Sequence, residues 1–254
     1  MTEAEWNNCT DPQAMLEFLR SDRGETRRKV GRRKMRLFAC ACLRGIWPLL
    51  RMSGSQGAVE VAEAFVDGLA NEQELHRAYH AARAALADEF PHLATGPYWQ
   101  SAEAAVHVAA SRFSGGDHAS VAHVPYSAAH AWALDRVGTG QGSERSLRVF
   151  ESQQARQAIH ADWLRDIFGR PFRAAPTIEP AVLAWNDRLV LKLARACYEE
   201  RHLPDGVLDS ARLNILADAL EEAGCDIEEL LGHLRSPVPH LRGCFALDLI
   251  LGKT

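Results

Sequence analysis

Long apolar runs are the first feature that this sequence of 254 residues lacks. Its two most apolar stretches are residues 37–50, interrupted by Arg44 and Pro48, and residues 243–252, which include Asp248. A membrane-spanning helix needs roughly 20 apolar residues, so neither stretch qualifies. The first residues, MTEAEWNNCTDP, have neither the basic nor the apolar segment of a secretory signal. The sequence therefore predicts a soluble, cytoplasmic protein with no membrane partner.

Strand patterns are also scarce. Alternation of apolar and polar residues is nearly absent, and so are runs of β-branched residues. Ala, Leu, Arg and Glu, which favour helices, fill most segments. We therefore predict an all-α fold, a multi-helix bundle of about ten helices with a helical hairpin at its C-terminal end.

Recognised catalytic patterns are missing as well. The glycine-rich stretch GTGQG at 138–142 follows no predicted strand and is not a dinucleotide fingerprint. The chain has neither a phosphate-binding GK[ST] motif nor a GxSxG nucleophile elbow. The six cysteines are expected to be free thiols, because a helical chain of this size does not need disulfides and Cys40 and Cys42 form no CxxC motif. No catalytic residue and no organic cofactor is predicted.

Capping residues and prolines divide the chain. Helix starts are predicted at Asp11, at Asn71 with Glu74, at Asp209, and at Asp226 with Glu229, and Gly224 is predicted to end a helix. The main helices are expected at 35–50, 58–70, 72–89, 99–113, 119–136, 144–168, 180–202 and 239–251. Three prolines make 170–180 non-helical, which predicts an N-terminal bundle (1–169) and a C-terminal helical region (170–254).

The strongest unusual feature is a basic segment at residues 20–36. It contains nine basic and two acidic residues, a net charge of +7 in a chain whose total charge is −4. Such a segment can bind nucleic-acid phosphates or an acidic protein surface, or it can simply be a solvated helix face. The segment contains no aromatic residue for base stacking. The candidate binding residues are Arg27, Arg28, Lys29, Arg32, Arg33, Lys34 and Arg36.

A cluster of cysteine and histidine near the C-terminus is a candidate zinc site. Its spacing is C-x7-H-x6-H-x3-C, from Cys225 through His233 and His240 to Cys244. An intervening helix would place Cys225 about 12 Å from His233, too far for both to bind one ion. His233, His240 and Cys244 can still converge around the proline turn between the two histidines. The alternative is that the cysteines are core residues and that the histidines bond loop carbonyls.

Other histidines are weaker candidates for ligands. His76 and His80 are four residues apart on a predicted helix but lack the glutamate of the metalloprotease pattern. His118, His123 and His130 fall in a histidine-rich middle region, where Asp117 or Glu103 could complete a metal or acid–base site. Their spacing does not require one, and polar helix faces are the alternative.

Several segments resemble an uncharacterised family of all-helical proteins of planctomycete bacteria. The segments are WNNCTDPQAMLEFLR, RKMRLFACACLRGIW, LRDIFGRPFR, LNILADALEEAGC and HLRSPVPHLRGCFALDLILGK. This resemblance implies a free-standing bacterial protein with an all-α fold and carries no activity. The last of these segments, with the helix before it, also resembles one unit of a HEAT-type repeat, although no period of about 40 residues recurs along the chain.

Three functional hypotheses follow. The first is a non-enzymatic interaction protein whose helical faces bind a protein partner, with the basic segment recruiting an acidic group. The second is a nucleic-acid-binding protein that uses the same basic segment. The third is a metal-dependent hydrolase, or a fold stabilised by a metal, built on the histidines.

Overall fold

The computed structural model describes residues 1–24, 27–90, 95–110 and 117–253, and the side chains of 117–120 lie outside this description. Within the described residues the fold is all-α and contains no strand, as the sequence predicted. A single isolated bridge joins Val207 to Leu241. No helix in the described part of the chain combines the length and apolarity that crossing a bilayer requires.

The chain folds into two compact units, which are Glu3–Ala161 (unit 1) and Asp162–Thr254 (unit 2). The division falls inside a long helix, α8, rather than at the proline segment after residue 169. The last turns of α8 belong to unit 2, where Leu164 and Ile167 are fully buried and Asp166 bonds to residues of the C-terminal segment. Residues 169–179 are non-helical, as the prolines predicted.

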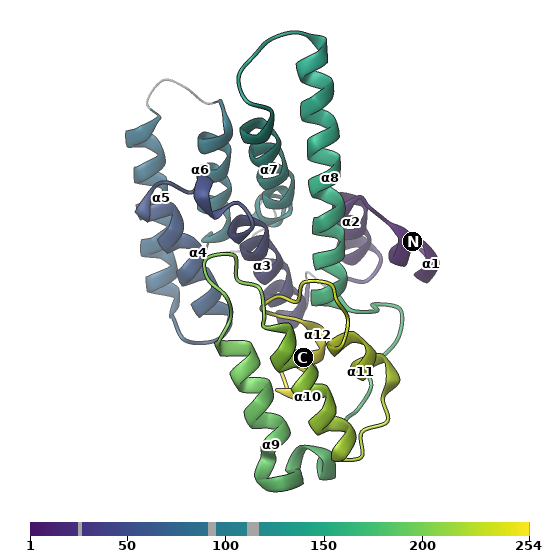
Figure 1. The fold of residues 1–254 in the computed structure, drawn as a ribbon. Coiled ribbons are helices and arrows are strands. Elements are labelled where there is room, and N and C mark those ends of the chain that lie inside the picture. Colours follow the sequence, from purple (N-terminus) through teal and green to yellow (C-terminus); the bar gives the residue numbers. More distant parts are fainter. Residues whose placement is uncertain (25–26, 91–94, 111–116, 254) are drawn as a thin grey trace. The chain divides into compact units, whose positions relative to one another are not determined.

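Unit 1 is a helical bundle in which α6 packs extensively on α7, α4 on α5, and α3 on both α4 and α7 (Figure 1). Alanines without exposed surface line α6 and α7, which allows the two helices to pack closely, as their composition predicted. Its helices are α1 (Glu3–Asn8), α2 (Pro12–Ser21), α3 (Lys29–Arg44), α4 (Ser53–Val66), α5 (Glu72–Glu89), α6 (Pro97–Val108), α7 (Asp117–Val137) and most of α8 (Ser143–Phe168), with a short 3₁₀ turn η2 (Trp47–Leu49).

Unit 2 packs α9 against both α10 and α12, and α11 against α10 (Figure 1). Its remaining helices are α9 (Pro180–Glu199), α10 (Ser210–Glu222), α11 (Glu228–Leu234) and α12 (Phe245–Ile250). Leu213, Leu216 and Leu220 of α10 are completely buried and form one side of its core. Isolated helices as short as α11 and α12 are unstable in water, so their stability comes from packing and side-chain contacts.

Most predicted caps are confirmed. The carboxylate of Asp209 accepts hydrogen bonds from the N–H groups of Ala211 and Arg212, and Asn71 and Glu74 form a complete capping box. Gly224 follows α10 with φ +88°, the left-handed conformation that favours glycine at a helix end.

Several helix limits differ from the sequence prediction. The helix predicted at 58–70 is Ser53–Val66, and the one predicted at 99–113 is Pro97–Val108. The helix predicted at 35–50 begins earlier, at Lys29, and ends at Arg44, where η2 replaces its last turn. The cap predicted at Asp226 is wrong, because α11 has Ile227 at that position without a side-chain cap. The helix predicted at 239–251 is only Phe245–Ile250, because residues 240 and 241 instead pair with the backbone of 207 and 208.

The helix α9 contains a break that its sequence did not reveal. Trp185 is extended, and the three residues after it, Asn186, Asp187 and Arg188, have φ values of +45°, +54° and +60°. Such left-handed residues are uncommon outside glycine. The break reverses the chain direction before the second part of the helix, which packs into the core of unit 2 through Val190 and Ala194.

Candidate metal centre

Four polar side chains converge at one point inside unit 2. Asp166 projects from the last turn of α8, and His233 from the last turn of α11. His240 lies in the segment after Pro239, and Cys244 is the N-cap residue of α12. Each residue offers one potential ligand atom, and these four atoms all lie within 4.8 Å of one another. The cluster could therefore hold a metal ion.

The individual distances show a common focus. Oδ1 of Asp166 lies 3.0 Å from Nε2 of His233 and 2.8 Å from Nδ1 of His240. Sγ of Cys244 lies 3.2 Å from the same Nε2 of His233 and 3.9 Å from Nδ1 of His240. Donors bound to one tetrahedral zinc ion are about 3.3–3.7 Å apart, from bond lengths of about 2.0–2.3 Å. Three of the observed separations, 2.8, 3.0 and 3.2 Å, are shorter than this range and are those of hydrogen bonds, and the fourth, 3.9 Å, is longer, so a bound ion would require small shifts of these side chains.

The groups behind the donors fix their orientation. Nε2 of His240, the nitrogen that faces away from the centre, lies 3.4 Å from the carbonyl oxygen of Ser236. A proton on that nitrogen leaves Nδ1 free to bind a metal. The second oxygen of Asp166 accepts a hydrogen bond of 2.9 Å from the N–H of Leu241. The backbone carbonyl of His240 in turn accepts from the N–H of Leu208 at 2.8 Å, which anchors the segment.

The centre is almost completely shielded from water. Asp166, His240 and Cys244 are at most 2% exposed, and the side chain of His233 is 15% exposed. The imidazole of His233 lies edge-on to that of His240 and is also in contact with the ring of Phe245. A charged group in such a place must be paired or must bind a metal. In this cluster the carboxylate and the two imidazoles supply such pairing even without an ion.

Burial and hydrogen bonding act in opposite directions on these groups. Burial alone would raise the pKa of Asp166, but its bonds to His233 and His240 outweigh that effect and lower the pKa. Burial would lower the pKa of His240, but the bond to Asp166 outweighs it and raises the pKa. Burial raises the pKa of the Cys244 thiol well above its usual value, and the Asp166 carboxylate adds to this effect, whereas the N–H groups of Leu247 and Ala246 bond to the sulfur and lower the pKa.

The geometry differs from that of a Cys–His–Asp catalytic triad. In a triad the histidine uses one nitrogen toward the nucleophile and the other toward the carboxylate. Here a single nitrogen, Nε2 of His233, faces both Sγ of Cys244 and Oδ1 of Asp166. Convergence of donors on one point is the arrangement of a metal site.

The sequence identified three of the four donors. His233, His240 and Cys244 come together, whereas Cys225 lies in the apolar core of unit 2 and outside the donor group. Asp166 was not identified, because it is 67 residues before His233. One local signal pointed to it. A carboxylate in the last turn of a helix lies next to the negative end of the helix dipole, so its presence there suggests another role.

The basic segment does not form one continuous exposed surface. Arg27, Arg28 and Lys29 are exposed, whereas the side chains nearer the middle of α3, those of Arg32, Arg33 and Lys34, are half-buried. Arg36 is fully buried, and it donates hydrogen bonds to the carbonyl oxygens of Val108 at 2.8 Å and Ala110 at 2.9 Å.

Two more bonds show internal roles for this segment. Arg33 forms an ion pair with Asp67 at 3.0 Å, and Arg32 donates to the carbonyl oxygen of Arg27. The sequence grouped Arg33 and Arg36 with the binding residues because it gives no sign of such distant acceptors.

The remaining histidines do not form a further group of three or more convergent ligands within the described residues. His76 and His80 lie side by side on α5, with Nε2 atoms 3.1 Å apart. His130 bonds to Gln153 at 3.0 Å, and His123 is exposed. The side chains of His118 and Asp117 lie outside the described residues.

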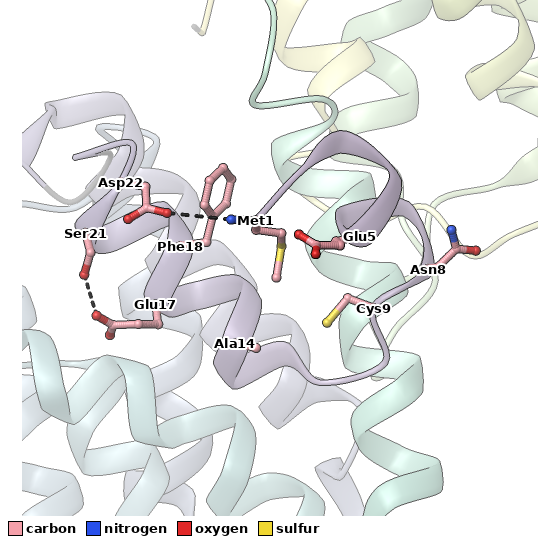
Figure 2. Close-up of a pocket in the computed structure, with 9 residues that line it drawn as sticks. All are labelled: Met1, Glu5, Asn8, Cys9, Ala14, Glu17, Phe18, Ser21 and Asp22. Atoms are coloured by element: carbon pink, nitrogen blue, oxygen red, sulfur yellow. Dashed lines mark hydrogen bonds and ion pairs between the residues drawn. The ribbon is translucent and has the colours of Figure 1, made fainter.

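An open pocket of about 600 Å³ lies between α1 and α2 in unit 1 (Figure 2). Among its three carboxylates, Glu17 bonds to Ser21 and Arg20, and Asp22 lies 3.8 Å from the amino group of Met1. The described residues of the pocket do not bring together a group of metal-ligating side chains, and the centre in unit 2 is the stronger candidate site.

Comparison with protein-family models gives no match for this chain, and comparisons with curated proteins and with solved structures give none either. The geometry of the centre is therefore the main indication of function.

Proposed function

We propose that this chain is a zinc-binding helical protein in which the ion has a structural role. The observation that carries the proposal is the convergence of Asp166, His233, His240 and Cys244 on one buried point, with donor atoms within 4.8 Å of one another. A structural ion at this point would hold together two helices too short to be stable alone, α11 and α12, and the end of α8.

The donor set favours zinc. Two imidazole nitrogens, one thiolate and one carboxylate oxygen are all common zinc ligands, and four of them complete its tetrahedral shell. The thiolate and imidazoles disfavour magnesium and calcium, which prefer six or more oxygen ligands.

A structural role is favoured over a catalytic one. Catalytic zinc sites have three protein ligands and an open position for water or substrate. Here four protein donors would fill the shell, and three of the four residues are almost inaccessible to solvent. The interaction-protein hypothesis therefore agrees better with the centre than the hydrolase hypothesis.

Metal analysis of the purified full chain tests this proposal. We expect one zinc per chain, and a thermal unfolding temperature that falls after chelation and recovers when zinc is restored. Replacement of zinc by cobalt should give the absorption of a tetrahedral ion with one thiolate ligand. A folded protein that stays metal-free after incubation with zinc would refute the proposal.

Variants identify the ligands. His240→Ala and Cys244→Ser should lose the bound ion, whereas Cys225→Ser is the matched control, because Cys225 is a buried thiol in the same unit but outside the donor group. If Cys244→Ser does not fold, the thiolate band of the cobalt-loaded wild type and of Cys225→Ser still decides whether Cys244 is a ligand.

We further propose that the protein acts by binding a partner rather than by catalysis, with the exposed residues Arg27, Arg28 and Lys29 contacting an acidic protein surface. The support for this role is that all three side chains are exposed to solvent. A nucleic acid is the alternative partner, because phosphates bind the same groups.

Affinity capture from native lysate, with and without nuclease, distinguishes these partners. The triple variant Arg27→Glu, Arg28→Glu, Lys29→Glu should lose the captured partner, and a control with three charge reversals on another exposed helix face should keep it. A nucleic-acid partner would disappear after nuclease treatment and weaken steeply with salt. Capture unaffected by the triple variant would contradict the role of these residues.

The cytoplasmic location and the kinship with planctomycete helical proteins also stand as proposals. All six cysteines are free thiols, which is the state expected in a reducing compartment. Fractionation of the native host cell would test the location.

A further inference from the structure

A second pair of convergent nitrogen donors lies on α5 in unit 1, and it does not depend on the function proposed for unit 2. His76 and His80 are four residues apart on this helix, and both are exposed. Their Nε2 atoms lie 3.1 Å apart, and their ring centroids 4.3 Å apart. We propose that His76 and His80 form a surface site that chelates a divalent transition-metal cation and that binds copper(II) most tightly.

The separation of the two nitrogens suits a shared ion. Two imidazoles bound to one cation at about 2.0–2.1 Å, with an angle of about 90–110° between the bonds, have nitrogens about 2.9–3.4 Å apart. The observed 3.1 Å lies in this range. In the absence of metal, one Nε2 must carry the proton that the other accepts, so a bound cation takes the place of that proton.

The helix holds the pair in position. α5 has 18 residues and begins with the capping box of Asn71 and Glu74, and it packs on both α4 and α6. Leu75 and Ala82 are fully buried on its inner face. The ring of Tyr79 meets that of His80 edge-on at 5.2 Å and restricts its motion. Little ordering is therefore needed when a cation binds.

The chemistry of the pair selects the class of ion. Imidazole nitrogens suit zinc, nickel and copper, and divalent copper binds such sites most tightly along the first-row series. Two protein donors leave the other coordination positions to water. The site on α5 therefore exchanges its ion readily, unlike the enclosed centre of unit 2.

Copper titration of the purified full chain, followed by electron paramagnetic resonance and calorimetry, tests the proposal. We expect one copper(II) bound with hyperfine coupling to two imidazole nitrogens. His76→Ala and His80→Ala should each weaken this binding by at least about tenfold, because each leaves a single donor. Both positions are exposed, so these variants should fold as the wild type does.

Two control variants separate this site from other sources of copper binding. His123→Ala removes another exposed histidine of unit 1 and should leave the titration unchanged. His240→Ala disables the buried centre and should leave the signal at α5 unchanged, so failure of one site is distinguished from failure of the other. Copper binding that survives in both His76→Ala and His80→Ala, or that disappears in His123→Ala or His240→Ala, would overturn the proposal.

Discussion

The ring of Phe245 lies against the imidazole of His233, with centroids 4.3 Å apart and ring planes inclined by 46°. Gly169, just after α8, approaches the same phenyl ring. Its φ is +62°, and a Cβ atom at this position would lie 2.9 Å from Cγ of Phe245. The glycine therefore provides the space for the ring that packs on His233, the most exposed residue of the cluster.

Gly169→Ala should destabilise the protein by about 2–4 kcal/mol, because a left-handed backbone and an overpacked ring both contribute. Gly252→Ala is the matched control, since Gly252 has φ +65° and open space around it. We expect this variant to be destabilised by only about 1 kcal/mol. Denaturant unfolding of zinc-loaded protein measures both. Equal losses in the two variants would show that contact with Phe245 has no cost.

Asp166→Asn should weaken zinc binding by at least about tenfold, because the amide keeps the shape of the carboxylate but loses its charge. Competition with a chromophoric chelator measures the affinity. Asp162→Asn is the control, since Asp162 is exposed one turn earlier on α8 and pairs with Arg165 at 2.7 Å. Unchanged affinity in Asp166→Asn would exclude the carboxylate as a ligand.

Without metal, the bond between Asp166 and His240 should make stability depend on pH. The pKa of His240 is raised in the folded state above its ordinary value of 6.5. Its stabilising contribution is therefore complete below that value and is lost as the pH rises through the folded-state pKa. The pKa of Asp166 is lowered below 3.8, so its contribution is present above that value and is lost as the pH falls through the folded-state pKa.

Zinc should reverse the first of these slopes. The free energy of unfolding of chelator-treated protein should fall as the pH rises above the ordinary histidine pKa of 6.5, whereas the stabilisation added by zinc should grow, because protons compete with the ion for its ligands. Thermal unfolding at several pH values, with and without zinc, measures both slopes. Parallel curves would contradict this expectation.

Arg188→Gly should stabilise the protein by about 0.5–1 kcal/mol, because a left-handed backbone at φ +60° is less costly for glycine. Arg195→Gly, at an exposed position in the regular part of the same helix, should instead destabilise it by about 0.5–1 kcal/mol. Opposite changes in the midpoint of denaturant unfolding would confirm the difference. Destabilisation by both would mean that the Arg188 side chain contributes more than its backbone costs.

Glu63→Leu should destabilise unit 1 by about 3–5 kcal/mol, because it leaves the guanidinium of Arg44 buried without its partner. The two side chains are each 4% exposed and are joined by two hydrogen bonds of 2.8 Å. The double variant Arg44→Met, Glu63→Leu should recover most of the loss. Little loss in Glu63→Leu would show that water or another group compensates for the charge.

Local sequence signals predicted the parts of the fold that local chemistry determines. The caps at Asn71 and Asp209 need only residues within one turn, so the sequence contains all the information. The predicted start of the last helix was wrong, since backbone pairing with Val207 and Leu208 competes with helix formation at residues 240 and 241. The left-handed run after Trp185 is also invisible, because Asn-Asp-Arg is compatible with a regular helix.

The candidate site divides in the same way. Three donors fall within one short segment around a proline turn, which is why spacing alone brought them together. Asp166 could be identified only from the structure, because the sequence does not show that the end of α8 packs against that segment. Arg36 shows the converse case, because its charge suggested a surface while its acceptors, Val108 and Ala110, are far along the chain.

Because α8 is continuous and contributes Asp166 to unit 2, the four residues of the centre need not be transferred together when gene fragments are exchanged. Exchange of gene fragments usually succeeds at loops, and the obvious loop here begins at Gly169. A fragment that starts there contains three of the four donors and leaves Asp166 behind. Three ligands and a vacant position are the pattern of zinc enzymes. With zinc bound as proposed, a single recombination at this loop would therefore leave an ion with three protein ligands and an open position, which is a starting point for catalysis.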